Sequence, residues 1–532
     1  MKSPAKSTIA MIAVVVVSFC IRLFFVARHE GLMSVDGGAY LLNLHWLATG
    51  DQIQDFKRPW LAPGYLFWPF VKALGYDWGI RTFAMVSWLP VLVPFWLLCR
   101  KALSPWPAVL AMTAVCFGWM LAEMFTAGPL PLIAFTPLFF VMWGIWGLAE
   151  SSGLWAPWKY TAAVILGIPA IVYINQTTVG VALYLVPVWT LAAIWLNPVD
   201  RKASVRWLVE CFVLAGLFSL PAISFYLDVA PGASATRYPG PWWTVYSFNN
   251  AVWYYNLFLL PVAVLGIWKG PRFIKAMGIL LLVSIPIGFS YSYDEGIHNI
   301  FYRTRYLYTF WFYLILSWLS WRYIAPRFPR PAYLGALAFA LAVLVSGNAY
   351  QIQAETKLGR MVTADTHDAI RWLQEQEIDG TIATNSYSMS LFVAALTGHQ
   401  SPWIQIYDPP EAYRVQHENM ICLVAWTTDC DHQAAIEALD VDYLLIDMIW
   451  PAVENEVYKQ VPGLSPVYGA LAHYRFSVWS WAINEDELLI LGKMWDAPEG
   501  TDPLPWAVTG LRATWLEPVW QKGYTKIWKV IR

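Results

Sequence analysis

The fold is decided first by the run TIAMIAVVVVSFCIRLFFVA, which occupies residues 8–27. About 20 predominantly apolar residues are enough for one α-helix to cross a bilayer, and this run has that length. Arg22 and Phe24-Phe25-Val26 follow its apolar core, and no small-residue cleavage site follows them. The run is therefore predicted to be a transmembrane helix and not a cleaved signal peptide.

The same pattern continues through the next three hundred residues. The chain of 532 residues is 58% hydrophobic and only 13% charged, whereas soluble globular proteins carry about 25% charged residues. Backbone groups must be satisfied inside lipid, which predicts a bundle of helices. Hydropathy predicts about 11 spans, at residues 8–27, 80–99, 105–124, 129–149, 160–177, 178–196, 207–227, 251–268, 276–292, 306–323 and 332–349.

Charge predicts the orientation and excludes one class of partner. With the N-terminus inside, the inner loops hold more basic residues than the outer loops, among them Arg100, Lys101, Arg201 and Lys202, which is the positive-inside pattern. An odd number of spans then places the first outer loop, residues 28–79, and the tail outside the cytoplasm. The net charge of -1 gives no reason to expect a nucleic-acid partner. The compact chain favours a prokaryotic plasma membrane.

The long apolar runs stop near residue 350, which predicts two domains: a membrane module, 1–350, and an extracytoplasmic soluble α/β domain, 351–532. Alternating short elements in the second domain predict its class. Helices are expected at 366–377, 386–396 and 432–439, strands at 381–384, 420–425 and 443–446, and a β-rich end at 470–532. Cys422 and Cys430 are candidates for a disulfide in this compartment, and the other four cysteines read as small apolar packing residues.

An acidic residue and a basic pair stand in the first outer loop. Asp36 directly follows the first span, and the apolar pattern from Leu41 to Ala48 predicts an amphipathic helix lying on the membrane surface. Lys57 and Arg58, followed by a proline, return the chain to the membrane. A carboxylate there suits a general base, and a neighbouring arginine can bind phosphate by paired hydrogen bonds. The alternative for Asp36 is an N-cap of the following helix.

Two later outer segments add basic candidates. Arg303 and Arg305 precede the tenth span, where two arginines suit a phosphate at headgroup level. Alternatively, they anchor the helix end by extending to the interface. Arg237 lies in the outer loop 228–250 beside Trp242-Trp243. That loop could contact substrate, or it could be an interfacial aromatic anchor.

Taken in order, these residues resemble the GT-C glycosyltransferases that use polyprenyl-phosphate sugars, such as protein O-mannosyltransferases and the lipid A aminoarabinose transferase. The resemblance covers the whole layout of a long first outer loop, about a dozen spans and a C-terminal outer domain. Its motifs are Arg22, Asp36 with Tyr40, Gly50-Asp51, Arg58-Pro59, Tyr65 with Trp68, and the later Arg303-Thr304-Arg305-Tyr306.

The resemblance implies a sugar transferase that works outside the cytoplasm with a sugar on undecaprenyl or dolichyl phosphate. Asp36 would be the catalytic base, and Arg58, less directly Lys57, would contact the donor phosphate together with Arg303 and Arg305. Displacement by a deprotonated acceptor inverts the anomeric centre. The acceptor is a protein, a lipid-linked glycan or a lipid headgroup. A divalent metal is not required if arginines neutralise a monophosphate, although some relatives bind one.

The resemblance also assigns a substrate cavity. Tyr40, Tyr65 and Trp68 are candidate walls, although aromatic packing explains them nearly as well, and Arg237 is a candidate contact. The chain departs from the family at Asp36-Gly37, where many members have Asp-Glu. A second acidic residue is common near the third and fourth spans, and Glu123 is the candidate here, with a helix-end carboxylate facing water as the alternative.

Two other classes compete with the transferase. A transporter or lipid-glycan flippase usually shows internal repeats and broken helices at mid-depth. The two halves of this chain show no repeat, and the charged candidates cluster on one face. A non-catalytic protein that binds a lipid glycan is the third class. A flippase should tolerate Asp36→Asn, whereas a transferase should not.

Overall fold

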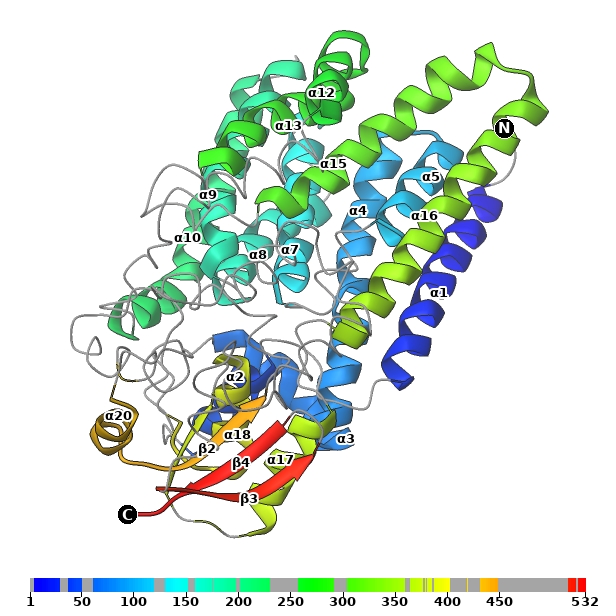
Figure 1. Ribbon diagram of the computed structural model, residues 1–532. Coiled ribbons are helices and arrows are strands. Elements are labelled where there is room, and N and C mark those ends of the chain that lie inside the picture. Colours follow the sequence, from blue (N-terminus) through cyan, green and yellow to red (C-terminus); the bar gives the residue numbers. More distant parts are fainter. Residues whose placement is uncertain are drawn as a thin grey trace.

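The computed structural model of the chain is a bundle of long helices with a small sheet and further helices at one end (Figure 1). It describes residues 4–28, 37–49, 61–118, 130–151, 158–174, 176–197, 201–229, 257–290, 304–358, 364–376, 378, 380–384, 387–401, 419, 431–447, 515–522 and 525–532.

The bundle contains a helix in each segment that hydropathy selected. Helix α2 (Gly37–Thr49) lies between the first and second predicted spans, and α3 (Leu61–Ser87) begins between them and runs into the second. The others are α1 (Pro4–Arg28), α4 (Leu89–Ala102), α5 (Pro105–Cys116), α7 (Leu130–Glu150), α8 (Trp158–Ile174), α9 (Gln176–Leu196), α10 (Arg201–Val229), α12 (Leu257–Lys269), α13 (Arg272–Ser290), α15 (Thr304–Leu319) and α16 (Arg330–Leu358).

Among the described residues, six helical stretches are long and apolar enough to cross a membrane. They are Lys6–Arg28, Gly64–Ala102, Leu132–Glu150, Thr178–Leu196, Arg201–Ser224 and Arg330–Ala349. Only 17% of the α1 window and 6% of the α16 window are buried in the protein. Apolar faces of this size are left for lipid, and the chain is a multi-pass membrane protein.

The second predicted span begins much earlier than expected. Helix α3 begins at Leu61, and together with α4 it forms the 39-residue stretch Gly64–Ala102. The residues before position 80 are apolar and aromatic enough to continue the helix. Gly75, with φ of 75°, interrupts the helical geometry inside α3, and this left-handed conformation is one that glycine adopts without steric cost.

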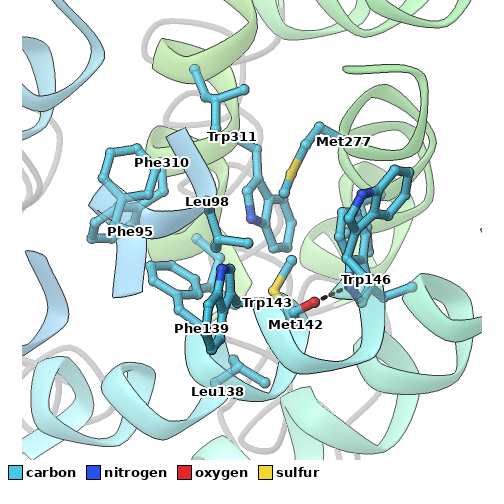
Figure 2. Packing of buried hydrophobic residues seen from close by; sticks show 14 of the residues in the cluster. Phe95, Leu98, Leu138, Phe139, Met142, Trp143, Trp146, Met277, Phe310 and Trp311 are labelled. Atoms are coloured by element: carbon cyan, nitrogen blue, oxygen red, sulfur yellow. Dashed lines mark hydrogen bonds between the residues drawn. The ribbon is translucent and has the colours of Figure 1, made fainter. Parts of the chain in front are cut away.

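The bundle core is rich in aromatic side chains (Figure 2). Phe310 of α15 meets Phe95 of α4 and Phe139 of α7 edge to face, with ring centroids 5.1 and 5.0 Å apart. The indole nitrogen of Trp189 donates to the Met142 carbonyl at 2.7 Å. Such ring pairs stabilise beyond the area they bury, so this core fixes how α4, α7, α9 and α15 pack.

The C-terminal region, which comprises α17, α18, α20 and the sheet, follows α16. Its helices are α17 (Ala364–Glu375), α18 (Tyr387–Thr397) and α20 (His432–Ala438). Its four strands, β1 (Thr381–Thr384), β2 (Val441–Asp447), β3 (Leu516–Lys522) and β4 (Thr525–Val530), are ordered β1-β2-β4-β3. Strands β1 and β2 are parallel, and the other pairs are antiparallel.

The elements predicted at 366–377, 381–384, 386–396, 432–439 and 443–446 therefore occur within a few residues of their expected positions. The strand expected at 420–425 lies outside the described residues. Helix α16 runs without interruption through the domain boundary proposed at 350.

The bundle and the C-terminal region share a second hydrophobic core, which we call the joining cluster. It consists of Val26 of α1, Tyr40 and Leu41 of α2, Phe67, Ile80, Phe83, Ala84 and Met85 of α3, Ala369, Ile370, Leu373, Ile382, Met389, Phe392, Val393, Tyr443, Leu445 and Ile527.

Helix α2 buries its apolar side within the protein, whereas its apolar pattern was expected to rest on the membrane surface. It packs between α3 and α18 (Figure 1), and its residues Tyr40 to Asn43 are buried. The physical reason is that the apolar face of α2 is covered by α18 of the C-terminal region.

Candidate functional site

Most candidates from the sequence lie in stretches that flank described helices. Outside the described residues are Asp36, Lys57, Arg58, Glu123, Arg237, Arg303, Cys422 and Cys430. Their proposed roles stay predictions, and so does the disulfide. What the structure gives is the position of the neighbouring helix ends. Helix α2 begins directly after Asp36, so the N-cap interpretation remains open, and α15 begins directly after Arg303 and includes Arg305.

The three aromatic candidates occupy different environments. Tyr40 is 1% exposed, and its ring lies 5.9 Å from that of Phe67 and 6.0 Å from that of Phe83. It is a packing residue of the joining cluster. Tyr65 and Trp68 on α3 are 67% and 47% exposed, and the ammonium of Lys72 lies 4.7 Å from the Trp68 ring. Exposed aromatic and basic side chains at a helix end suit the membrane interface.

Arg22 is the most unusual buried side chain in the bundle. It is completely buried in α1, where it donates to the Ser18 hydroxyl, to the Ser18 carbonyl at 3.2 Å and to the Cys116 carbonyl at 3.2 Å. Its guanidinium lies 4.4 Å from the Trp88 ring. Ser18 also donates to the Cys116 carbonyl, at 2.9 Å. An ionisable group inside a membrane protein is a functional-site candidate.

The Cys116 carbonyl that Arg22 contacts lies at the C-terminal end of a helix. Cys116 is the last residue of α5, and the final carbonyls of a helix have no partner within the helix. They also carry the negative end of the helix dipole. Arg22 therefore neutralises and fixes the end of α5, after which the chain continues toward Glu123.

Two residues that were not candidates from the sequence, Asn348 and Tyr313, contact Gly118 just after the end of α5. The Asn348 side chain of α16 is 2% exposed and donates to the Gly118 carbonyl at 3.4 Å. A β-carbon on Gly118 would lie 3.0 Å from the ring of Tyr313 on α15. Asn348 is a lone amide in an apolar span, a signal that could have marked it. Helices α1, α15 and α16 thus meet at the end of α5.

The helix ends next to the candidate residues, which are the end of α1 and the starts of α2 and α15, lie at the same end of the bundle. Helices α15 and α16 form a hairpin, with the hydroxyls of Ser320 and Tyr333 3.1 Å apart near the turn. The start of α15 therefore lies beyond Tyr313, on the side of the C-terminal region. The end of α1 and the start of α2 are on that side too, since Val26 and Tyr40 belong to the joining cluster.

Polar contacts fasten α3 to α1 and to α17. Arg81 is 3% exposed, pairs with Asp77 at 2.7 Å and donates to the Val26 carbonyl at 3.0 Å. The hydroxyl of Tyr76 lies 3.0 Å from Nε2 of His367. Burial lowers the pKa of His367, so the neutral imidazole is favoured in this contact.

The described part of the chain contains no metal-binding cluster, and its cysteines are free thiols. No group of three or more His, Cys, Asp or Glu side chains there is placed to hold a metal ion. Cys99, Cys116 and Cys211 are buried free thiols, as expected for packing residues, whereas the free thiol of Cys20 is exposed on α1.

The whole fold resembles solved membrane transferases. The archaeal oligosaccharyltransferase AglB from Archaeoglobus fulgidus, in complex with an inhibitory peptide and a dolichol-phosphate, superposes with a TM-score of 0.58 at 12% identity, over 96% of this chain and 79% of that chain. ArnT from Cupriavidus metallidurans, bound to undecaprenyl phosphate, superposes with a TM-score of 0.51 at 11% identity, over 98% of this chain and 97% of that chain.

This chain has the GT-C glycosyltransferase fold. A second A. fulgidus oligosaccharyltransferase structure, tethered to an acceptor peptide containing the NVT sequon, gives a TM-score of 0.52 at 12% identity, over 98% of this chain and 88% of that chain. No family model and no curated protein matches the sequence. The likeness is thus carried by the GT-C fold and not by shared sequence.

Proposed function

We propose that the chain is a membrane glycosyltransferase that moves a sugar from a polyprenyl-phosphate donor to an acceptor on the extracytoplasmic face. The observation that carries the proposal is the likeness along nearly the whole chain to ArnT bound to undecaprenyl phosphate. The AglB structure with a dolichol-phosphate supports the same class of donor. The joint position of the candidate-bearing helix ends on one side of the bundle agrees with it.

The proposed reaction needs few groups. The Asp36 carboxylate takes the proton of the acceptor, the acceptor atom bonds to the anomeric carbon, and the bond from that carbon to the phosphate oxygen breaks. The sugar is transferred with inversion, and polyprenyl phosphate leaves. Arg58, Lys57, Arg303 and Arg305 are the proposed ligands of the leaving phosphate. The main task of the protein is then to position the acceptor against the donor.

The same proposal assigns roles to the remaining candidate residues. Glu123 is the proposed second carboxylate, and Arg237, Tyr65 and Trp68 are proposed contacts of the substrate cavity. Tyr40 contributes through the packing of α2. The acceptor is a protein, a lipid-linked glycan or a lipid headgroup.

The test compares sugar transfer from short-chain polyprenyl-phosphate donors by purified wild type, Asp36→Asn and Asp55→Asn. Asp55 is another carboxylate of the same loop, so its variant is the matched control. We expect Asp36→Asn to lose turnover by about 100-fold or more while it still binds donor, and Asp55→Asn to stay active. The same assay in sealed right-side-out vesicles tests the membrane face, because a water-soluble donor reaches only an outward-facing site.

A flippase gives a different result. Donor binding without turnover in the wild type, across several sugars and acceptors, would reject the transferase in favour of transport or binding. Transport of a lipid-linked glycan that survives Asp36→Asn would point to the flippase.

A further inference from the structure

The contact between α2 and α18 is made at the two glycines that directly follow Asp36. A β-carbon on Gly37 would lie 2.7 Å from Cζ of Phe392, and a β-carbon on Gly38 would lie 2.6 Å from the Phe392 backbone nitrogen. Real β-carbons essentially never approach other atoms within 3.0 Å. A larger residue at Gly38 therefore requires the backbone of α18 to move, and a larger residue at Gly37 requires the Phe392 ring to move.

Helix α18 is itself anchored by buried packing and hydrogen bonds. Phe392 is 0% exposed and Leu391 is 1% exposed. The hydroxyls of Ser390 and Ser401 are hydrogen-bonded at 2.7 Å in a buried position, and the Gln374 side chain donates to the Leu396 carbonyl at 2.6 Å. An anchored helix that touches the backbone of its neighbour can fix the position of that neighbour.

We propose that α18 of the C-terminal region positions the catalytic base, by holding Gly37 and Gly38 and with them the residue one peptide unit earlier. Consecutive Cα atoms are about 3.8 Å apart, so the place of Gly37 limits the place of Asp36. Leu391 and Phe392 are thus positioning residues for the reaction. The inference rests on the proposed function of Asp36.

This inference gives a physical reason for the departure from the Asp-Glu pattern. A glutamate at position 37 would place its side chain against Phe392 of α18 and, at 3.3 Å, against Ile80 of α3. The C-terminal region is then part of the catalytic apparatus in addition to any role in acceptor choice.

The test is a size exchange across the contact. Gly37→Ala adds a methyl group that meets only the tip of the Phe392 ring and Ile80, and Phe392→Leu removes that tip. We expect Gly37→Ala to lower kcat by about 10- to 100-fold, with the donor KM within about twofold of wild type. The double variant Gly37→Ala/Phe392→Leu should recover the kcat of Phe392→Leu alone, which is the coupling expected of residues in contact.

Two glycines provide matched controls. A methyl group at Gly38 meets backbone atoms of α18, so Phe392→Leu should not rescue Gly38→Ala. Gly335 on α16 has no atom within 4 Å of an added β-carbon, so Gly335→Ala should keep wild-type kcat. If Gly37→Ala does not fold, Phe392→Ala is the second measurement, because it removes the contact without adding atoms and should lower kcat at unchanged KM.

The outcomes separate this inference from the proposed function. Wild-type kcat in Gly37→Ala, a loss that Phe392→Leu does not relieve, or an effect on KM alone would overturn the positioning role. Turnover retained in Asp36→Asn would instead reject Asp36 as the base, and the inference with it. Loss of turnover in Asp36→Asn beside an unaffected Gly37→Ala rejects the inference only.

Discussion

Arg22 brings a guanidinium into the interior of the bundle, where its described contacts include the carbonyl at the end of α5 and the Trp88 ring. A hydrogen bond to a charged group contributes about 1.5–3 kcal/mol. Replacement by methionine keeps much of the apolar volume but leaves the Cys116 carbonyl without this donor. We expect Arg22→Met to lower the free energy of unfolding by about 2 kcal/mol, measured by denaturant titration in mixed micelles.

Arg206 gives the control for this prediction at the same scale. It pairs with Glu210 one helical turn away on α10, and its side chain is 81% exposed. Exposed pairs of this kind contribute little, so Arg206→Met should unfold like the wild type. Equal stability losses in the two variants would show that burial of Arg22 is not what makes it important.

At the scale of elements, replacement of glycine by alanine is expected to have opposite effects on stability at Gly75 and at Gly216. Gly75 inside α3 has φ of 75°, whereas Gly216 is an ordinary residue of α10, and an added β-carbon meets no atom within 4 Å at either position. Backbone with φ of 75° and ψ of 174° is essentially restricted to glycine and costs another residue about 1–3 kcal/mol, whereas alanine is better than glycine by about 1 kcal/mol inside a helix. Gly75→Ala should therefore destabilise the protein and Gly216→Ala should stabilise it, in the same unfolding assay. If Gly75→Ala stabilised the protein, the positive φ and the interruption of α3 at this position would be contradicted.

The positions of individual helices and strands could be predicted from the sequence. Long apolar runs and short alternating segments are local patterns, and they located α1 and α18 within a few residues and the start of α16 within two, although α16 continues beyond its predicted end at 349 to Leu358. What covers a helix is not a local property. The apolar face of α2 was assigned to the membrane surface because nothing in its pattern names α18 as its partner.

The candidate site divides in the same way. The order of charged and aromatic residues pointed to the GT-C class, and the chain shares the fold of the transferases AglB and ArnT. The convergence of Arg22, Tyr313 and Asn348 on the end of α5 could not be read from positions that are far apart in the chain. Gly37 looked like the loss of a supporting carboxylate, whereas in the structure an added β-carbon at this position would lie 2.7 Å from the tip of the Phe392 ring.

At the scale of the whole molecule, the contact between Tyr76 and His367 makes the attachment of the C-terminal region sensitive to pH. His367 is 5% exposed on α17, and the charged groups around it are Asp77 and Arg81 of α3 and Asp368 and Arg371 of its own helix. Burial lowers the pKa of His367 from its usual value near 6.5. The folded protein therefore binds this proton less readily than the unfolded chain does.

The sign of the effect follows from linkage. Stability from the neutral imidazole is complete above the unfolded pKa and decreases as the pH falls below about 6.5, because the unfolded chain then takes up the proton first. The ion pair of Asp368 with Lys522, which lowers the pKa of that carboxyl, weakens only at more acidic pH, below the usual range of an aspartate. The two effects therefore occupy separate pH windows.

We expect the unfolding temperature of the wild type to fall between pH 7.5 and pH 5.5, and His367→Gln to show a smaller fall over the same interval. Glutamine can still hydrogen-bond to Tyr76 but does not titrate. His399→Gln, which changes a histidine just after α18 in the same region, should keep the wild-type pH dependence. An identical pH dependence in His367→Gln and wild type would show that protonation of this histidine does not loosen the attachment of the C-terminal region to the bundle.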